Sequence, residues 1–467
     1  MKTKGIVALL LSFVLLLSFV SCDIVFNVED TSEGLENTET ETESESKTET
    51  ETKTEADKNE NTNNNNNDND SANENTNIGD TTNTDNNEAV EDSENTNNDT
   101  SEDNVNEDIT NDSNTNEGDE VKEIVTMTYN IADSMNNIKA LGRTSVGSSG
   151  LYCDNVATGI EFNAYIEGDL VIALTISRGS FTTDGVIEKS LNDDCYFTLF
   201  IDGVRVEERI KATKSSDATI TLATFDEGGV HNIRFVKQTE PRNALCEIKT
   251  LSFTGYFEEK PQDAEHYIEF IGASTSCGYG NLTTVSAAIE AQKSENQDST
   301  QAFPYLTAQN LGVDYSVVGA SGIGLVKGFR PFNMPFMFGV TSAYRSQTEF
   351  YAPTRKPDAV IINLSGNDYN KGVKAEEWRA GAMSFIAQIR GIYGKDVPII
   401  WIYMKDNTYF PTLTQNIFDD LGGEENGLYL CKTTNNTEGG NGHHNIAGQQ
   451  KVAQEIAAFI QEKGILN

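Results

Sequence analysis

The stretch His266-Tyr-Ile-Glu-Phe-Ile-Gly-Ala-Ser-Thr-Ser-Cys-Gly-Tyr-Gly280 decides how the C-terminal part of this chain is interpreted. A short apolar run, residues 267–271, ends at Gly272, and Ser274 follows at once. A buried strand of an open α/β sheet brings a side chain to the carboxyl edge of the sheet in this way, and ligands usually bind there. Ser274 is therefore a candidate nucleophile.

The residues around this stretch alternate between two kinds of pattern. Short apolar runs predict strands at 268–274, 315–319, 359–364, 398–403 and 428–431. Longer patterns predict helices at 301–311, 375–393, 412–421 and 446–464. Alternation of this kind predicts a parallel sheet covered by helices on both faces. Residues 264–467 are therefore expected to form one α/β domain.

The preceding segment, residues 123–258, has a different character. Strand-like runs that alternate apolar and polar residues recur there at short spacing, and turn signals such as Glu167-Gly168-Asp169 and Glu227-Gly228-Gly229 separate them. Several short strands with regular turns predict a β-sandwich domain. The segment contains no cluster of residues with obvious chemistry.

The N-terminus has the pattern of an export signal. Lys2 and Lys4 precede an apolar core at residues 6–20, which is too short for a spanning helix with these flanks. Phe19-Val20-Ser21-Cys22 resembles a bacterial lipobox, which implies a signal peptide over residues 1–22 and a lipid on Cys22. The alternative is an ordinary secretory signal with a chance cysteine. We expect an exported protein anchored to the bacterial cell surface or envelope through this lipid.

Residues 23–122 form an acidic segment rich in Thr, Glu and Asn. They contain 32 acidic residues and 4 lysines and so carry most of the chain's net charge of −39. A segment with so few apolar residues cannot offset its chain entropy, so we expect a disordered tether. The acidic balance argues against a nucleic-acid partner, because binding phosphates requires clustered Lys and Arg.

Five cysteines follow Cys22, at positions 153, 195, 246, 277 and 431. Their spacing includes no metal-type pair. A disulfide within 153–246 and buried free thiols are both compatible with an exported protein, so no pairing is predicted.

The residues needed for acyl transfer occur in order along the α/β segment. Ser274 would be the nucleophile, and His443, just before the last predicted helix, would be the base. The backbone amides of Ser274 and Gly322 and the side chain of Asn367 would hold the oxyanion. The adjacent His444 makes a weak metal site conceivable, but no Cys or acidic ligand is near. We therefore expect neither a metal nor an organic cofactor.

Together these motifs resemble the SGNH/GDSL hydrolases. The family blocks correspond to Gly272–Ser276 with Gly278-Tyr-Gly280, to Ser321-Gly-Ile-Gly324, to Ser365-Gly-Asn-Asp368 and to Asn441-Gly-His-His444. With the sandwich segment, residues 123–467 resemble carbohydrate esterase family two. The resemblance implies a jelly-roll-like accessory domain and hydrolysis of O-acetyl esters on a polysaccharide such as xylan or mannan. We expect the enzyme to be a monomer.

Three positions depart from the family pattern. Ala273 replaces the Asp before the nucleophile, Ser365 replaces a Gly, and Asn441 replaces the Asp that would orient the base. Losing that Asp lowers turnover of a serine protease by about four orders of magnitude. The resembled family includes Ser–His dyads in which a backbone carbonyl orients the histidine, which implies that His443 could act without this Asp. The alternative is an inactive glycan-binding lipoprotein. A third reading is an esterase acting on envelope polymers or lipids.

The segment from Gly324 to Arg345 is rich in aromatic residues. In the resembled family this region borders the substrate cleft, so these rings could form a sugar-contacting wall. Packing beneath a long loop is the alternative for each ring. The aromatic residues are Phe329, Phe332, Phe336, Phe338 and Tyr344.

Overall fold

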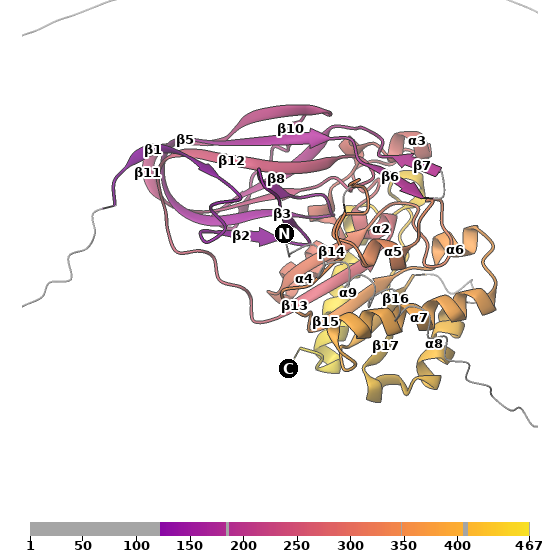
Figure 1. Ribbon diagram of the computed structural model, residues 1–467. Helices are drawn as coiled ribbons and strands as arrows, with labels where there is room; N and C mark the ends of the chain where they lie inside the picture. Colours follow the sequence, from indigo (N-terminus) through magenta and orange to yellow (C-terminus); the bar gives the residue numbers. More distant parts are fainter. Residues whose placement is uncertain (1–121, 184–185, 347, 405–409, 467) are drawn as a thin grey trace, which may run out of the picture. The chain divides into compact units, whose positions relative to one another are not determined.

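The computed structural model describes residues 122–183, 186–346, 348–404 and 410–466. The predicted signal peptide, Cys22 and nearly all of the 23–122 tether lie outside these residues. The described part of the chain contains a large antiparallel sheet followed by a parallel sheet with helices (Figure 1).

The antiparallel sheet is built by the first half of the described chain, in the order β10-β8-β11-β5-β12-β4-β3, with β1, β2 and β9 paired to β12, β5 and β8. Its strands are β1 Val125–Asn130, β2 Ile138–Leu141, β3 Ser145–Val146, β4 Leu151–Tyr152, β5 Gly159–Ser177, β8 Cys195–Ile201, β9 Val204–Arg205, β10 Ile210–Ala212, β11 Ser216–Lys237 and β12 Leu245–Phe257. A separate hairpin pairs β6 Ser180–Thr183 with β7 Val186–Lys189. The all-antiparallel character agrees with the sequence analysis, while the jelly-roll arrangement stays a prediction.

Two of the turns expected from the sequence are absent. The residues 167–169 lie within the single strand β5, and the residues 227–229 lie within β11. The pairing of β11 with β5 shifts register between Phe225 and Gly229, and Gly168 has a positive φ of 71°. These glycines therefore lie at irregularities within long strands. Glycine is common both in turns and in β-bulges, and at a β-bulge the strand pairing continues on either side.

The parallel sheet has the order β14-β13-β15-β16-β17, and all its neighbours run parallel. Its strands are β13 Tyr267–Gly272, β14 Asp314–Gly319, β15 Ala359–Asn363, β16 Ile399–Tyr403 and β17 Leu428–Lys432. Because the strands run parallel, their carboxyl ends meet at one edge of the sheet. The order of the strands switches sides at β13, since β14 lies on one side of it and β15 on the other. This sheet confirms the α/β part of the prediction.

Helices cover both faces of the parallel sheet. Ile361 and Ile400 share a core with α4 and α9, while their neighbours Val360 and Ile399 share a second core with α7 and α8. The helices are α2 Ser274–Cys277, α3 Ala288–Ala291, α4 Phe303–Leu311, α5 Met334–Phe338, α6 Gly366–Asn370, α7 Ala375–Tyr393, α8 Phe410–Asp420 and α9 Ile446–Lys463. Short 3-10 turns lie at Ser294–Asn296, Ser299–Gln301, Gly423–Asn426 and Gly440–Gly442. None of the described helices is long and apolar enough to cross a bilayer.

The two sheets share one core. Val156 and Val236, from the antiparallel part, pack with Val317 of β14 and with residues of α4 and α9. A backbone bridge also joins Val156 to Val317. Shared apolar burial is the main stabilising term in folding, so the antiparallel part helps to stabilise the parallel sheet.

The cysteines within the described residues are all buried and unbridged. Of the two possibilities that the sequence left open, the structure has free thiols.

Candidate active site

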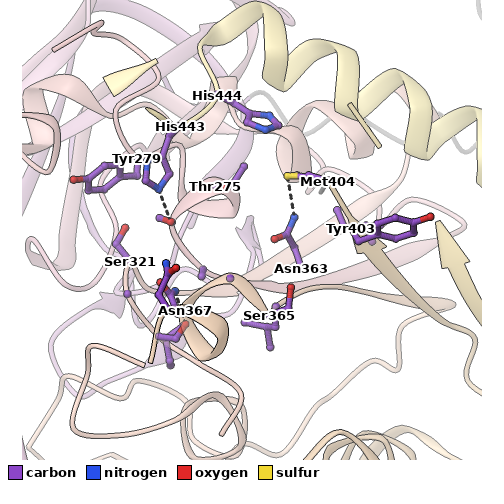
Figure 2. Close-up of a pocket in the computed structure, with 18 of the residues that line it drawn as sticks. Thr275, Tyr279, Ser321, Asn363, Ser365, Asn367, Tyr403, Met404, His443 and His444 are labelled. Atoms are coloured by element: carbon purple, nitrogen blue, oxygen red, sulfur yellow. Dashed lines mark hydrogen bonds between the residues drawn. The ribbon is translucent and has the colours of Figure 1, made fainter. Parts of the chain in front are cut away.

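All four residues proposed for catalysis from the sequence line one cavity of about 580 Å³. Ser274 follows β13, Gly322 follows β14 and Asn367 follows β15, while His443 precedes α9. The parallel topology brings these distant positions together because it places the ends of successive strands at one edge. Figure 2 shows His443 on one side of this cavity, with Ser321 and Asn367 on the other.

Ser274 is the first residue of the short helix α2 rather than the last residue of a strand. The predicted strand 268–274 was therefore two residues too long. Gly272 permits the tight exit from β13, since a Cβ there would lie 1.9 Å from Ser276 Oγ. The helix ends at Gly278, which has a left-handed φ of 77°. Local chain geometry thus turns the Ser274 hydroxyl toward the cavity.

The His443 imidazole contacts the Ser274 hydroxyl, with 2.8 Å between Nε2 and Oγ (Figure 2). The loop that carries His443 is held against the loop after α2, because the Gly440 amide donates to the Gly280 carbonyl at 2.8 Å. A Cβ on Gly280 would lie 2.9 Å from the Gly440 oxygen, so a glycine is required for this approach. The Tyr279 ring packs beside the imidazole, with 4.5 Å between ring centroids.

The second nitrogen of His443 faces a backbone carbonyl. Nδ1 lies 3.2 Å from the carbonyl oxygen of Asn441, which itself has a left-handed φ of 53°. Asn tolerates this conformation better than most residues with a side chain. A carbonyl accepts only from a protonated Nδ1, and that tautomer leaves Nε2 free to accept a proton from Ser274.

The proposed oxyanion donors lie on the same cavity wall. Gly322 has a φ of 85°, and a Cβ there would lie 3.1 Å from the Nε of Arg330. A side chain at this position would be strained and would crowd Arg330. Asn367 lies in α6, and its Nδ2 donates to the Ile323 carbonyl at 2.7 Å. The Asn367 amide has a second N–H, so it can also donate to a bound oxygen.

A buried carboxylate that the sequence analysis left without a role holds the loop after Gly322. Asp368 is fully buried, and its oxygens accept from the backbone amides of residues 325, 326 and 327 at 2.7–2.9 Å. Burial raises the pKa of Asp368 above its ordinary value, and these three donors offset only part of the rise. The family block that ends at residue 368 was the only signal for this position.

Two other buried polar residues that sequence reasoning missed also contact the catalytic loops. Glu240 is fully buried, and its Oε2 accepts from the Ser321 amide at 2.5 Å. Gln449 of α9 donates to the Thr275 carbonyl at 3.0 Å and accepts from the Phe303 amide. A polar residue on the apolar face of the last helix could have indicated Gln449, but no pattern connects Glu240 with Ser321.

Cys277 lies three residues after Ser274 but does not offer a competing nucleophile. It is buried, and burial raises the pKa of its thiol well above the usual range. The thiolate is the reactive form of cysteine, so Cys277 stays inert. The described residues contain no group of three His, Cys, Asp or Glu side chains that could hold a metal ion.

The aromatic residues between 324 and 345 divide between the cavity and the core. Phe329 lines the cavity and is 48% exposed. Phe332, Phe338 and Tyr344 are buried in the core that contains α7. Phe336 lies outside the cavity lining, against Phe181 at 4.9 Å between ring centroids. One ring of the five therefore remains as a candidate sugar contact.

Comparison with curated proteins finds carbohydrate-active esterases, although no protein-family model matches the chain. A cellulase/esterase of Acetivibrio thermocellus is 28% identical over 205 residues, which are 41% of this chain and 23% of that protein. An acetylxylan esterase/glucomannan deacetylase of Cellvibrio japonicus is 26% identical over 170 residues, which are 32% of this chain and 43% of that protein. The chain thus spans less than half the length of these two relatives.

Solved structures share the fold over most of the described residues. A family two carbohydrate esterase from Clostridium thermocellum, solved in complex with cellohexaose, has a TM-score of 0.61 and 22% identity and covers 70% of this chain and all of that one. An acetyl xylan esterase from Butyrivibrio proteoclasticus has a TM-score of 0.62 and 18% identity, and the match covers 73% of this chain and 100% of that chain. The fold is therefore that of the SGNH-like hydrolases, and the sequence matches support a carboxylic ester hydrolase.

Proposed function

We propose that this protein hydrolyses O-acetyl esters on polysaccharides, with acetylated hemicellulose such as xylan or mannan as the substrate class. The observation that carries the proposal is the 2.8 Å contact between His443 Nε2 and Ser274 Oγ, inside a cavity that Gly322 and Asn367 also line. The curated similarity to an acetylxylan esterase/glucomannan deacetylase supports the choice of polymer.

In the first half of the reaction, His443 acts as base. Its Nε2 takes the Ser274 proton while Oγ attacks the acetyl carbonyl carbon, and the carbonyl oxygen becomes an oxyanion. The amides of Ser274 and Gly322 and the Nδ2 of Asn367 are the proposed donors to this oxygen. His443 then gives its proton to the sugar oxygen, the ester bond breaks, and the deacetylated sugar departs.

In the second half, water attacks the acetyl group on Ser274. His443 takes a proton from this water, the same donors hold the second oxyanion, and acetate leaves as Oγ recovers its proton. Throughout, the Asn441 carbonyl accepts from Nδ1 and so keeps the imidazole in the productive tautomer. A carbonyl is neutral, so it stabilises the imidazolium less than a carboxylate would.

A substrate panel tests this proposal. We expect the full chain to release acetate from acetylated xylan or acetylated glucomannan faster than from acetylated envelope polymers, and not to release fatty acids from lipids. A preference for envelope polymers or lipids would instead establish an esterase of a different substrate class that uses the same residues.

The second candidate function is glycan binding by a protein that no longer catalyses ester hydrolysis. The observation that favours it is Asn441, because a family carboxylate is missing at the position that would orient His443. A folded parent chain that releases no acetate from any of these substrates, yet binds deacetylated xylan in a pull-down assay, would establish a glycan-binding protein instead.

We further propose that the protein is exported, lipidated at Cys22 and held at the cell surface as a monomer, with residues 23–122 as the tether. The lipobox-like sequence and the acidic composition of the tether support this proposal. Replacing Cys22 by Ser should move the protein from the membrane fraction to the soluble exported fraction. If the protein stays in the membrane fraction after this substitution, the anchor proposal is wrong.

A further inference from the structure

The cavity that contains Ser274 is cationic, although the whole chain has a net charge of −39. Two arginines, Arg242 and Arg330, line it. Among the described residues, no Asp or Glu side chain lines the same cavity. An isolated positive charge in a partly enclosed site of an acidic protein attracts a negative charge on a ligand.

One of the two arginines already has a counter-charge within the protein. The Nη1 of Arg330 forms an ion pair with Glu188 of β7, and both side chains are largely buried. The guanidinium packs against Gly322, with its Nε 3.1 Å from the position a Cβ would take. Arg330 therefore shapes the oxyanion wall, and its charge is balanced.

The charge of Arg242 has no such partner. Within the described residues its guanidinium forms no ion pair, and its Nη2 donates to the neutral Oε1 of Gln292 at 2.9 Å. Its Nε is buried and has no hydrogen-bond partner. Glu240, two residues before Arg242, accepts from the Ser321 amide. Asp193, which lies beside Asn243 in space, accepts from the Ser294 amide at 2.8 Å.

Arg242 lines the same cavity as the proposed catalytic histidine. It lines the cavity with Tyr279, and its charge lowers the pKa of Tyr279 while burial raises it. The Tyr279 ring in turn packs beside His443 (Figure 2). A group bound to Arg242 would therefore lie in the same cavity as an acetyl ester that is attacked by Ser274.

We infer that Arg242 is a specificity-determining residue that binds a carboxylate of the substrate, so that the preferred substrate is an acetylated glycan that also carries a uronic acid. This inference rests on the proposed esterase function. A guanidinium matches a carboxylate with two parallel N–H donors. One positive charge without an ion-pair partner among the described residues fits a monoanion better than the doubly charged phosphate monoester.

The test compares two substrates that differ only in this charge. One is a mono-acetylated xylo-oligosaccharide with a glucuronic acid branch, and the other is the same compound with the carboxyl group converted to its amide. A charge-assisted bond in a partly buried site predicts a kcat/KM for acetate release about 10- to 100-fold higher for the acid with the full parent chain. Equal values for the two substrates would overturn the inference.

Variants test whether Arg242 causes the preference for the acid substrate over the amide substrate. In Arg242→Gln the ratio of the acid to the amide should fall to about 1, and in Arg242→Lys it should be intermediate, because the charge is retained without the planar fork. Arg379→Gln is the matched control, since Arg379 lies on α7 outside the cavity and pairs with Asp420, and it should keep the parent ratio. A parent ratio that survives in Arg242→Gln would contradict the role of Arg242.

A binding measurement separates this inference from the proposed function. Calorimetric titration of the parent with the deacetylated acid and amide oligosaccharides needs no turnover, so it reports on Arg242 even if the protein is not an esterase. Tighter binding of the acid that disappears in Arg242→Gln supports the inference. Equal binding of the two compounds by the parent overturns the inference. This comparison uses the parent alone, so it holds even if Arg242→Gln does not fold.

Discussion

At the scale of single residues, the orientation of His443 decides whether the site is competent. Asn441 stands where the resembled family has Asp, yet its backbone oxygen lies 3.2 Å from Nδ1. Since any residue has a carbonyl, the amino acid required at 441 is one that tolerates a φ of 53°. The side chain is then secondary, and the backbone conformation is the feature that matters.

We therefore predict that Asn441→Gly keeps esterase activity within about tenfold of the parent, because glycine adopts a left-handed conformation without strain. Asn441→Val should lose far more, since a β-branched residue at this φ is an outlier that would displace the carbonyl. Steady-state kcat on 4-nitrophenyl acetate measures both. If Asn441→Gly were as inactive as a His443→Ala variant, the Asn441 side chain, and not its carbonyl, would orient the base.

At this scale the structure brings together residues that sequence reasoning singled out after strands or within motifs, while their catalytic roles stay a prediction. Ser274, Gly322, Asn367 and His443 all line the cavity, as the order of the motifs predicted. Arg242 and Glu240 could not be predicted, because they come from the connection between β11 and β12, and neither periodicity nor a motif relates that connection to the site. Their roles follow only from the packing of the two sheets.

At the scale of elements, the loop after β14 depends on one carboxylate in α6. Asp368 accepts three successive backbone amides, and those residues follow the glycine that is proposed to hold the oxyanion. A buried carboxylate that accepts several N–H groups fixes a loop more firmly than apolar contacts could, because each donor has a defined direction.

Asp368→Asn should therefore lower both stability and catalysis. The side-chain NH₂ would face backbone donors, so we expect a loss of about 2–4 kcal/mol in the free energy of unfolding from unsatisfied buried groups. The kcat should fall at least about tenfold in the molecules that remain folded, since Gly322 loses its support. Urea unfolding and kcat measured at a temperature where the variant is folded give the two values.

Asp358→Asn is the matched control for that variant. Asp358 also accepts a backbone amide, that of Tyr267, but it is partly exposed and does not line the cavity. Its substitution should leave kcat near the parent value. An Asp368→Asn protein with the kcat of this control would show that the loop keeps its shape without the carboxylate.

The sequence predicted the strands and the four longest described helices of the α/β part within a few residues, since buried parallel strands are short apolar runs and long helices are amphipathic. It did not predict the short helices α2, α3, α5 and α6. The long strands β5 and β11 were divided wrongly at residues 167–169 and 227–229. Glycine-rich acidic triplets are typical of both turns and β-bulges, and only the partner strand decides between the two.

At the scale of the whole molecule, a buried ion pair joins the two sheets. Arg143, which follows β2, donates to Glu269 of β13 at 2.7 Å and to the carbonyl of Phe338 at 2.7 Å. Both charged side chains are at most 1% exposed. Burial alone would lower the pKa of Arg143, but Glu269 and the adjacent tyrosines raise it above its ordinary value. The Arg143 guanidinium therefore stays charged in this buried site.

Arg143→Met should destabilise the protein by about 3–5 kcal/mol, because it leaves the Glu269 carboxylate buried without its counter-charge. Because the sheets share a core, both sheets should unfold together in a single transition, in the parent and in the variant. Calorimetry combined with urea unfolding checks both points. Two separate transitions in the parent would mean that the sheets are independent units, and the shared core would then contribute little.

The most direct test of the central claim is acetate release by the full chain, by Ser274→Ala and by Ser276→Ala, on acetylated xylan and on 4-nitrophenyl acetate. Ser276 is a matched control, because it lies in the same short helix and its buried hydroxyl has no hydrogen-bond partner. We predict an active parent, loss of at least about 1,000-fold in Ser274→Ala, and retention in Ser276→Ala. Activity that survives in Ser274→Ala, or a folded parent without activity on either substrate, would contradict catalysis by Ser274 and His443.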